Sequence, residues 1–155
     1  MKLPVIIFLI LMIFGKPVFA QEPTKTPYTL LGVFDGRTPC NVLAAYLNAP
    51  PSSDCIKIKW RLTLFVDSIS HKPGRYELIG ITYKRENPRI GTWQILNGTH
   101  QDPQAIVYQL NETGRPPLLF QKCGNNVLFF LDEERKLLVG NRDFSYTLNR
   151  NFEKY

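Results

Sequence analysis

The sequence predicts an all-β protein, a small antiparallel β-barrel with one short helix near its start. The first observation is the segment 56–66, in which apolar residues alternate with Lys57, Lys59, Arg61 and Thr63. Side chains of a strand point alternately to opposite faces, so this segment predicts a long strand with one buried face. A helix would scatter the three cations among its core positions. The second observation is that about eight or nine short apolar segments follow one another, separated by turn signals.

Closure of the sheet distinguishes a barrel from other all-β folds. Many short strands leave unpaired edges, and closing the sheet on itself removes them. The hairpin-like succession of strands favours the barrel, and a two-sheet sandwich is the alternative.

Residues 1–20 are typical of a secretory signal peptide. Lys2 supplies a positive charge, residues 5–14 are an unbroken apolar run, and small residues precede the expected cleavage between Ala20 and Gln21. The apolar run is about half the length that a membrane-spanning helix needs. A bacterial lipid anchor requires a cysteine where Gln21 stands. We therefore expect an exported protein, periplasmic or secreted, with no membrane span and no lipid anchor.

The rest of the chain predicts one domain. Residues 21–29 lack an apolar period and form an extended lead-in, residues 30–150 form the barrel, and residues 151–155 are a C-terminal tail. Turn signals such as Asn97-Gly98 separate the strands. The expected strands are 30–36, 56–66, 75–85, 90–96, 105–110, 118–122, 127–131, 137–139 and 144–148.

Two cysteines flank the expected helix. Residues 41–47 place their apolar side chains on one helical face, between Cys40 and Cys55. In an exported protein this pair predicts a structural disulfide, which would stabilise the fold by roughly 3 kcal/mol. Cys123 is left over at the end of a hairpin, as a free thiol or a half-buried small residue.

The basic charge has two interpretations. The formal net charge is +6 at pH 7, and removal of Lys2 and Lys16 with the signal peptide would leave +4. Lys and Arg are spread over nearly every segment rather than gathered in one stripe, so we expect no nucleic-acid partner. A solvated surface is the preferred interpretation, and an anionic ligand or a membrane surface is the alternative.

Short motifs follow one another in a definite order along residues 30–150. They are GVFDG at 32–36, TPC at 38–40, a second cysteine just before the alternating strand, GTW at 91–93, LD at 131–132, LVG at 138–140 and YTL at 146–148. In this order they resemble the N-terminal domain of the NlpE family, envelope lipoproteins linked to copper resistance and to surface-stress signalling. The resemblance implies a lipocalin-like barrel that acts as a binding or sensing module. The family's two cysteines form a Cys-x-x-Cys pair, whereas here residues 41–54 separate them.

The sequence offers no motif for catalysis. Gly-x-Ser-x-Gly, His-Glu-x-x-His and phosphate-binding glycine loops do not occur. His71 and His100 stand in separate polar segments and are expected to be solvated. We therefore expect neither an enzyme nor a cofactor. The alternative function is periplasmic metal handling by Cys40, Cys55 and Cys123, because thiolates suit soft metal ions.

The main hypothesis is an exported, non-enzymatic binding or sensing barrel of the bacterial envelope, acting in envelope stress or copper homeostasis. Its expected partner is a small apolar ligand or an envelope protein. Trp60 and Trp93 are the residues that would line an interior pocket, and core packing is the simpler role for each.

Overall fold

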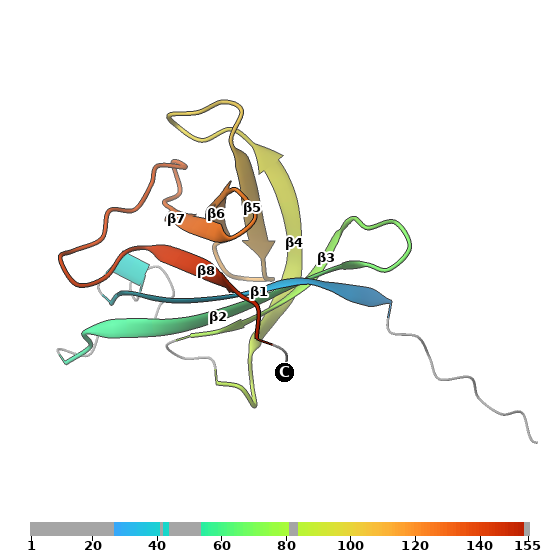
Figure 1. The fold of residues 1–155 in the computed structure, drawn as a ribbon, viewed down its shortest axis with the longest axis horizontal. Helices are drawn as coiled ribbons and strands as arrows, with labels where there is room; N and C mark the ends of the chain where they lie inside the picture. Colours follow the sequence, from blue (N-terminus) through green and yellow to red (C-terminus); the bar gives the residue numbers. More distant parts are fainter. Residues whose placement is uncertain (1–26, 41, 44–53, 81–83, 154–155) are drawn as a thin grey trace, which may run out of the picture.

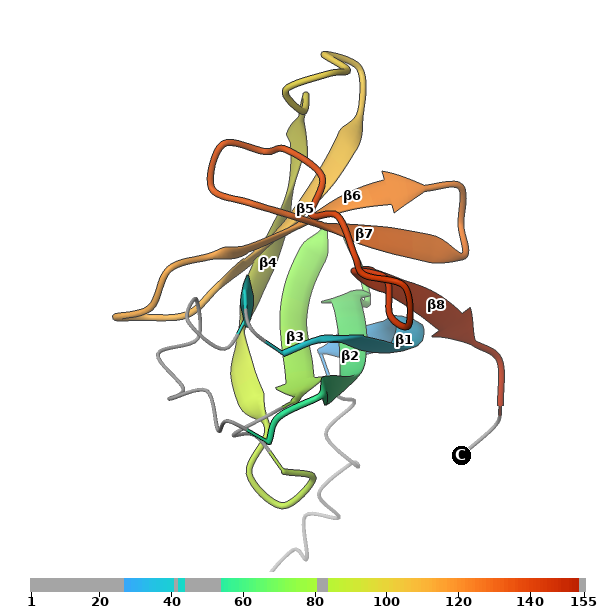
Figure 2. The same cartoon turned by 90° about the vertical axis from the view of Figure 1, so that its left-hand side faces the viewer.

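The computed structural model describes residues 27–40, 42–43, 54–80 and 84–153. These residues form eight strands, and each pairs antiparallel with the next. The last strand returns to the first, so the sheet closes into a barrel (Figures 1 and 2). The strands are β1 Tyr28–Pro39, β2 Lys57–Asp67, β3 Pro73–Ile79, β4 Arg89–Asn97, β5 Ile106–Asn111, β6 Leu118–Cys123, β7 Val127–Leu131 and β8 Thr147–Asn151. The predicted antiparallel barrel is confirmed, and the sandwich is excluded.

Two predicted elements differ from the structure. The short helix between the cysteines is not among the described elements, because only Val42 and Leu43 carry helical backbone there and the rest of 41–53 lies outside the described residues. Residues 137–139 are not a strand, since Leu137 makes only an isolated bridge to Leu131. A turn follows instead, in which the Asn141 side chain accepts hydrogen bonds from the backbone N–H groups of 143 and 144. The last strand therefore begins at Thr147 and not at Phe144.

Alternating side chains of β2 supply one wall of the core. Ile58, Trp60, Leu62 and Leu64 are all buried, whereas Lys57 and Lys59 are exposed. The pattern read from the sequence therefore holds, because each apolar residue points inward and each cation points outward.

Aromatic rings meet across the interior. The ring centroids of Trp60 on β2 and Phe130 on β7 are 5.5 Å apart, and Phe120 on β6 lies 4.5 Å from Phe130. β2 and β7 belong to opposite walls, since β8 and β1 separate them on one side and four strands on the other. An eight-stranded barrel is just wide enough for its own side chains to fill it. These rings therefore occupy the interior between the two walls.

Two arginines lie at opposite ends of the barrel. Arg89, at the start of β4, has a side chain only 1% exposed, and its Nε lies 2.6 Å from a carboxylate oxygen of Glu112. Arg150, on β8, donates to the carbonyl of Leu31 at 2.5 Å and lies over the ring of Phe34. β4 and β8 run in the same direction, so the start of one and the end of the other are at opposite ends. Each end of the barrel thus carries a guanidinium group with a polar partner, a carboxylate for Arg89 and a backbone carbonyl for Arg150.

Candidate functional site

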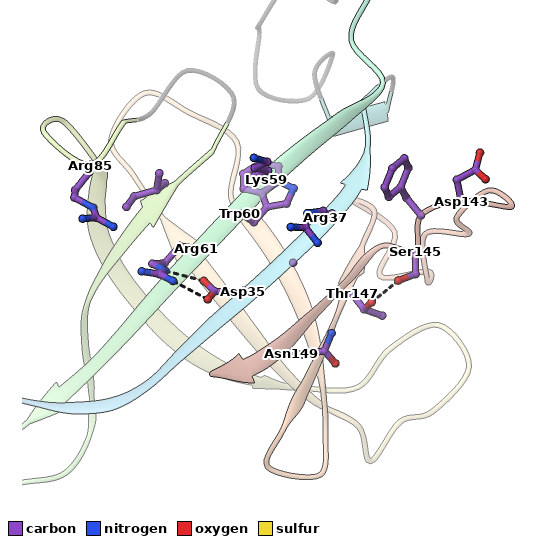
Figure 3. Close-up of a pocket in the computed structure, with 13 residues that line it drawn as sticks. Asp35, Arg37, Lys59, Trp60, Arg61, Arg85, Asp143, Ser145, Thr147 and Asn149 are labelled. Atoms are coloured by element: carbon purple, nitrogen blue, oxygen red, sulfur yellow. Dashed lines mark hydrogen bonds and ion pairs between the residues drawn. The ribbon is translucent and has the colours of Figure 1, made fainter. Parts of the chain in front are cut away.

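The candidate site is an open groove on the outer face of the barrel, with a volume of about 690 Å³ (Figure 3). Its floor consists of outward-pointing side chains of β8, β1, β2 and β3. Arg85, between β3 and β4, lines one side, and residues 143–145, between β7 and β8, line the other. The charged side chains that line it are Asp35, Arg37, Lys59, Arg61, Arg85 and Asp143, and Phe144 adds an aromatic ring.

Strand register places the charged residues of the floor opposite one another. Along the β1–β2 pair, Asp35 faces Arg61 and Arg37 faces Lys59. All four residues alternate with buried ones, so their side chains share the outer face of the sheet. Directly opposed side chains in an antiparallel pair have Cβ atoms about 4.5–5.5 Å apart, close enough for their charges to interact.

The first of these pairs is charge-balanced. The guanidinium group of Arg61 donates two hydrogen bonds to the carboxylate of Asp35, both at 2.8 Å. The side-chain amide of Asn151 donates a third at 2.6 Å. The hydrogen bond from Arg61 is the main cause that lowers the pKa of Asp35. The carboxylate of Asp35 therefore already accepts three hydrogen bonds from neighbouring side chains.

The second pair is not balanced. Arg37 and Lys59 are directly opposed, carry the same sign and are both exposed. Within the described part of the chain neither forms an ion pair, and the same holds for Arg85 on the side of the groove. Figure 3 shows Arg37 and Lys59 on adjacent strands, with no dashed line from either. Like charges placed directly opposite destabilise a sheet, so folding alone does not favour this arrangement.

An aromatic side chain and two hydroxyl groups lie on the side opposite Arg85. The ammonium group of Lys57 lies 5.6 Å from the ring centroid of Phe144. The hydroxyl groups of Ser145 and Thr147 are hydrogen-bonded to each other (Figure 3). The groove thus offers unpaired cations together with hydroxyl groups, a donor set that suits a multiply charged anion.

No family model, no curated protein and no solved structure matches this chain. Among the described residues, no helix is long and apolar enough to cross a membrane.

Both tryptophans, the candidates for an interior pocket, have the simpler role of core residues. The indole N–H of Trp60 donates to the hydroxyl of Thr38 at 2.8 Å, and that of Trp93 donates to the carbonyl of Phe65 at 2.7 Å. Both side chains are at most 4% exposed. Trp60 also borders the groove from beneath, whereas Trp93 packs against Tyr108 elsewhere in the core.

The predicted disulfide between Cys40 and Cys55 is confirmed, with the two Cα atoms 5.8 Å apart. These sulfur atoms are bonded to each other and are not thiolate ligands. Cys123 is an exposed free thiol. No group of three or more His, Cys, Asp or Glu residues in the described ranges could hold a metal ion. Nothing in the described structure thus favours the metal-handling alternative, and His71 and His100 lie exposed in different loops.

The sequence did not predict this groove. It placed Lys59 and Arg61 on the charged face of the strand expected at 56–66, without assigning them a binding role. Arg37 was not singled out, because only the strand register shows that it stands opposite Lys59. The relevant signal was the pair of alternating charges Asp35 and Arg37 in the first strand, which places both on one face.

Proposed function

We propose that this protein is an exported, non-enzymatic binding module that captures an anionic ligand in its outer groove. One observation carries the proposal, the directly opposed pair Arg37 and Lys59. Two adjacent cations without a carboxylate partner raise the energy of the folded protein. A bound anion would remove that repulsion and would gain charge-assisted hydrogen bonds from both side chains.

A catalytic role is not proposed. Asp35 is the carboxylate on the groove floor, and Arg61 holds it in the ionised form by two hydrogen bonds. A general base needs a pKa near the working pH, and a lowered carboxyl pKa is the opposite adjustment. The arrangement therefore favours binding over proton transfer.

Export is supported by two features. Residues 1–20 have the charge and apolar pattern of a signal peptide, and disulfides such as Cys40–Cys55 persist mainly in oxidising compartments. The resemblance of short motifs to the NlpE family supports placement in the bacterial envelope and a sensing role there. In this proposal the sensed species is an anion, since Cys40 and Cys55 are not free to bind copper.

Calorimetric titration of the purified protein with tripolyphosphate at low ionic strength tests the proposal. The wild type is expected to bind, and the double variant Arg37→Gln/Lys59→Gln is expected to bind at least about tenfold more weakly, because each change removes a charge-assisted contact. Lys72→Gln is the matched control, since Lys72 is exposed beyond the far end of β2. Its affinity should stay within about twofold.

The same double variant should be slightly more stable than the wild type, by a few tenths of a kcal/mol, because the repulsion between the two cations is gone. Weaker binding together with unchanged or higher stability would show that the pair serves the ligand rather than the fold. A wild type that does not bind tripolyphosphate, or a double variant that binds it equally well, would refute the proposal.

A further inference from the structure

Two of the most exposed aliphatic residues neighbour, along the chain, residues that lie close to Phe144 of the basic groove. Ile56 is 74% exposed and Val139 is 87% exposed. Ile56 immediately precedes Lys57, whose ammonium group lies over the ring of Phe144. Val139 precedes Gly140, where an added Cβ would lie 2.2 Å from the carbonyl oxygen of Phe144. Ile56 and Val139 are therefore the sequence neighbours of Lys57 and Gly140, and both of these lie close to Phe144.

The fold presents these residues at one end of the barrel. The β1–β2 connection and the β7–β8 connection emerge at the same end, because alternate strands run in the same direction (Figure 1). Ile56 follows Cys55, whose disulfide ties it to the buried Cys40. Ile56 is thus adjacent to a residue that a disulfide holds in place.

A soluble anion in the groove would not account for these two exposed residues, because neither of them lines the groove. A membrane surface accounts for both features. Anionic headgroups attract Lys and Arg, and each cation near the surface strengthens adsorption about fivefold. Exposed aliphatic side chains next to the cations can enter the boundary between headgroups and acyl chains.

We propose that this end of the barrel docks on an anionic phospholipid bilayer, with headgroup phosphates in the groove and Ile56 and Val139 in the interfacial layer. Arg37, Lys57, Lys59 and Arg85 supply the attraction. The inference rests on the proposed function, since it identifies the source of the anion.

Sedimentation with vesicles tests the inference. The protein should bind vesicles made of equal parts phosphatidylcholine and phosphatidylglycerol and should not bind vesicles of phosphatidylcholine alone. The variant Ile56→Ser/Val139→Ser, which keeps every charge, should bind the anionic vesicles about tenfold more weakly because less apolar surface is buried. Ile69→Ser is the matched control, since Ile69 is 88% exposed in the β2–β3 turn at the other end of the barrel. It should bind as the wild type does.

The outcomes separate this inference from the proposed function. If tripolyphosphate binds but anionic vesicles do not, the docking inference is wrong and the anion site stands. If neither binds, both are wrong. Equal binding of anionic vesicles by the wild type and by Ile56→Ser/Val139→Ser would overturn the docking orientation. Far-UV circular dichroism of each variant confirms that the fold is retained.

Discussion

At the scale of single residues, the outer face of β1 and β2 contrasts two neighbouring charge pairs. Asp35 and Arg61 form a hydrogen-bonded ion pair, whereas Arg37 and Lys59, one pair further along, repel each other. Both pairs share the same strands and the same solvent-facing side, so backbone geometry does not explain the difference. The balanced pair stabilises the sheet, whereas the unbalanced pair is unfavourable for the sheet unless another group offsets the repulsion.

Replacing Asp35 by Asn should lower stability and strengthen anion binding. The free energy of unfolding at neutral pH should fall by about 0.5–1 kcal/mol, the usual worth of a half-exposed ion pair. Tripolyphosphate should bind more tightly because Arg61 is released from its partner. Urea titrations and calorimetry measure the two effects. Glu133→Gln, an equal change of charge at an exposed turn residue, is the control.

The pH dependence of the Asp35 contribution follows from the direction of its pKa shift. The hydrogen bond from Arg61 lowers the pKa of Asp35 below its ordinary value of 3.8. The stabilisation is therefore complete above pH 3.8 and is lost as the pH falls through the lowered pKa of the folded state. The stability difference between wild type and Asp35→Asn should shrink below pH 3.8. A difference that persists unchanged in strong acid would contradict this account.

At the scale of elements, the β1–β2 connection depends on its disulfide. Residues 40–56 join two adjacent, paired strands, and the Cys40–Cys55 bond closes this long connection at its base. The sequence predicted the bond because both cysteines border a single segment of an exported chain. The sequence predicted the ends of the nearby strands less accurately. β1 continues to Pro39 instead of ending at Gly36, and β3 ends at Ile79 instead of Arg85. Such ends depend on partner strands that a local pattern does not reveal.

Replacing both cysteines, as Cys40→Ala/Cys55→Ala, should lower the free energy of unfolding by about 3 kcal/mol, because the unfolded chain gains the freedom of an open loop. Denaturant titration measures the loss, and a thiol reductant should produce the same loss in the wild type. Cys123→Ser is the control and should change stability by less than about 0.5 kcal/mol, since Cys123 is exposed. Wild-type stability that does not respond to reduction would contradict a structural role for the bond.

At the scale of the whole molecule, the closed barrel could be predicted because alternation in β2 fixed the inward face and turn signals marked most hairpins. The groove could not be predicted in full, because it arises where four strands and two connections meet. Three residues of the short motifs at 32–36, 38–40 and 91–93 have structural roles. Gly36 lies against β8, Thr38 accepts the hydrogen bond of Trp60, and Gly91 lies against Asn111. Arg37, Lys59 and Arg85, the cations of the groove without an ion-pair partner among the described residues, stand outside these motifs.

The barrel closes where the first strand, β1, pairs with the last, β8. Gly36 pairs with Leu148 where β1 meets β8, and an added Cβ would lie 2.3 Å from the carbonyl oxygen of Thr147. Because that atom belongs to the backbone, Gly36→Ala should force the two strands apart and lower the free energy of unfolding by about 1–3 kcal/mol. Amide hydrogen exchange should accelerate most in β8. Gly124→Asn is the control, since this turn glycine has open space around it and a φ of +57° that Asn tolerates. If the β8 amides of Gly36→Ala stay as protected as those of the wild type, the pairing of the first and last strands does not depend on this glycine.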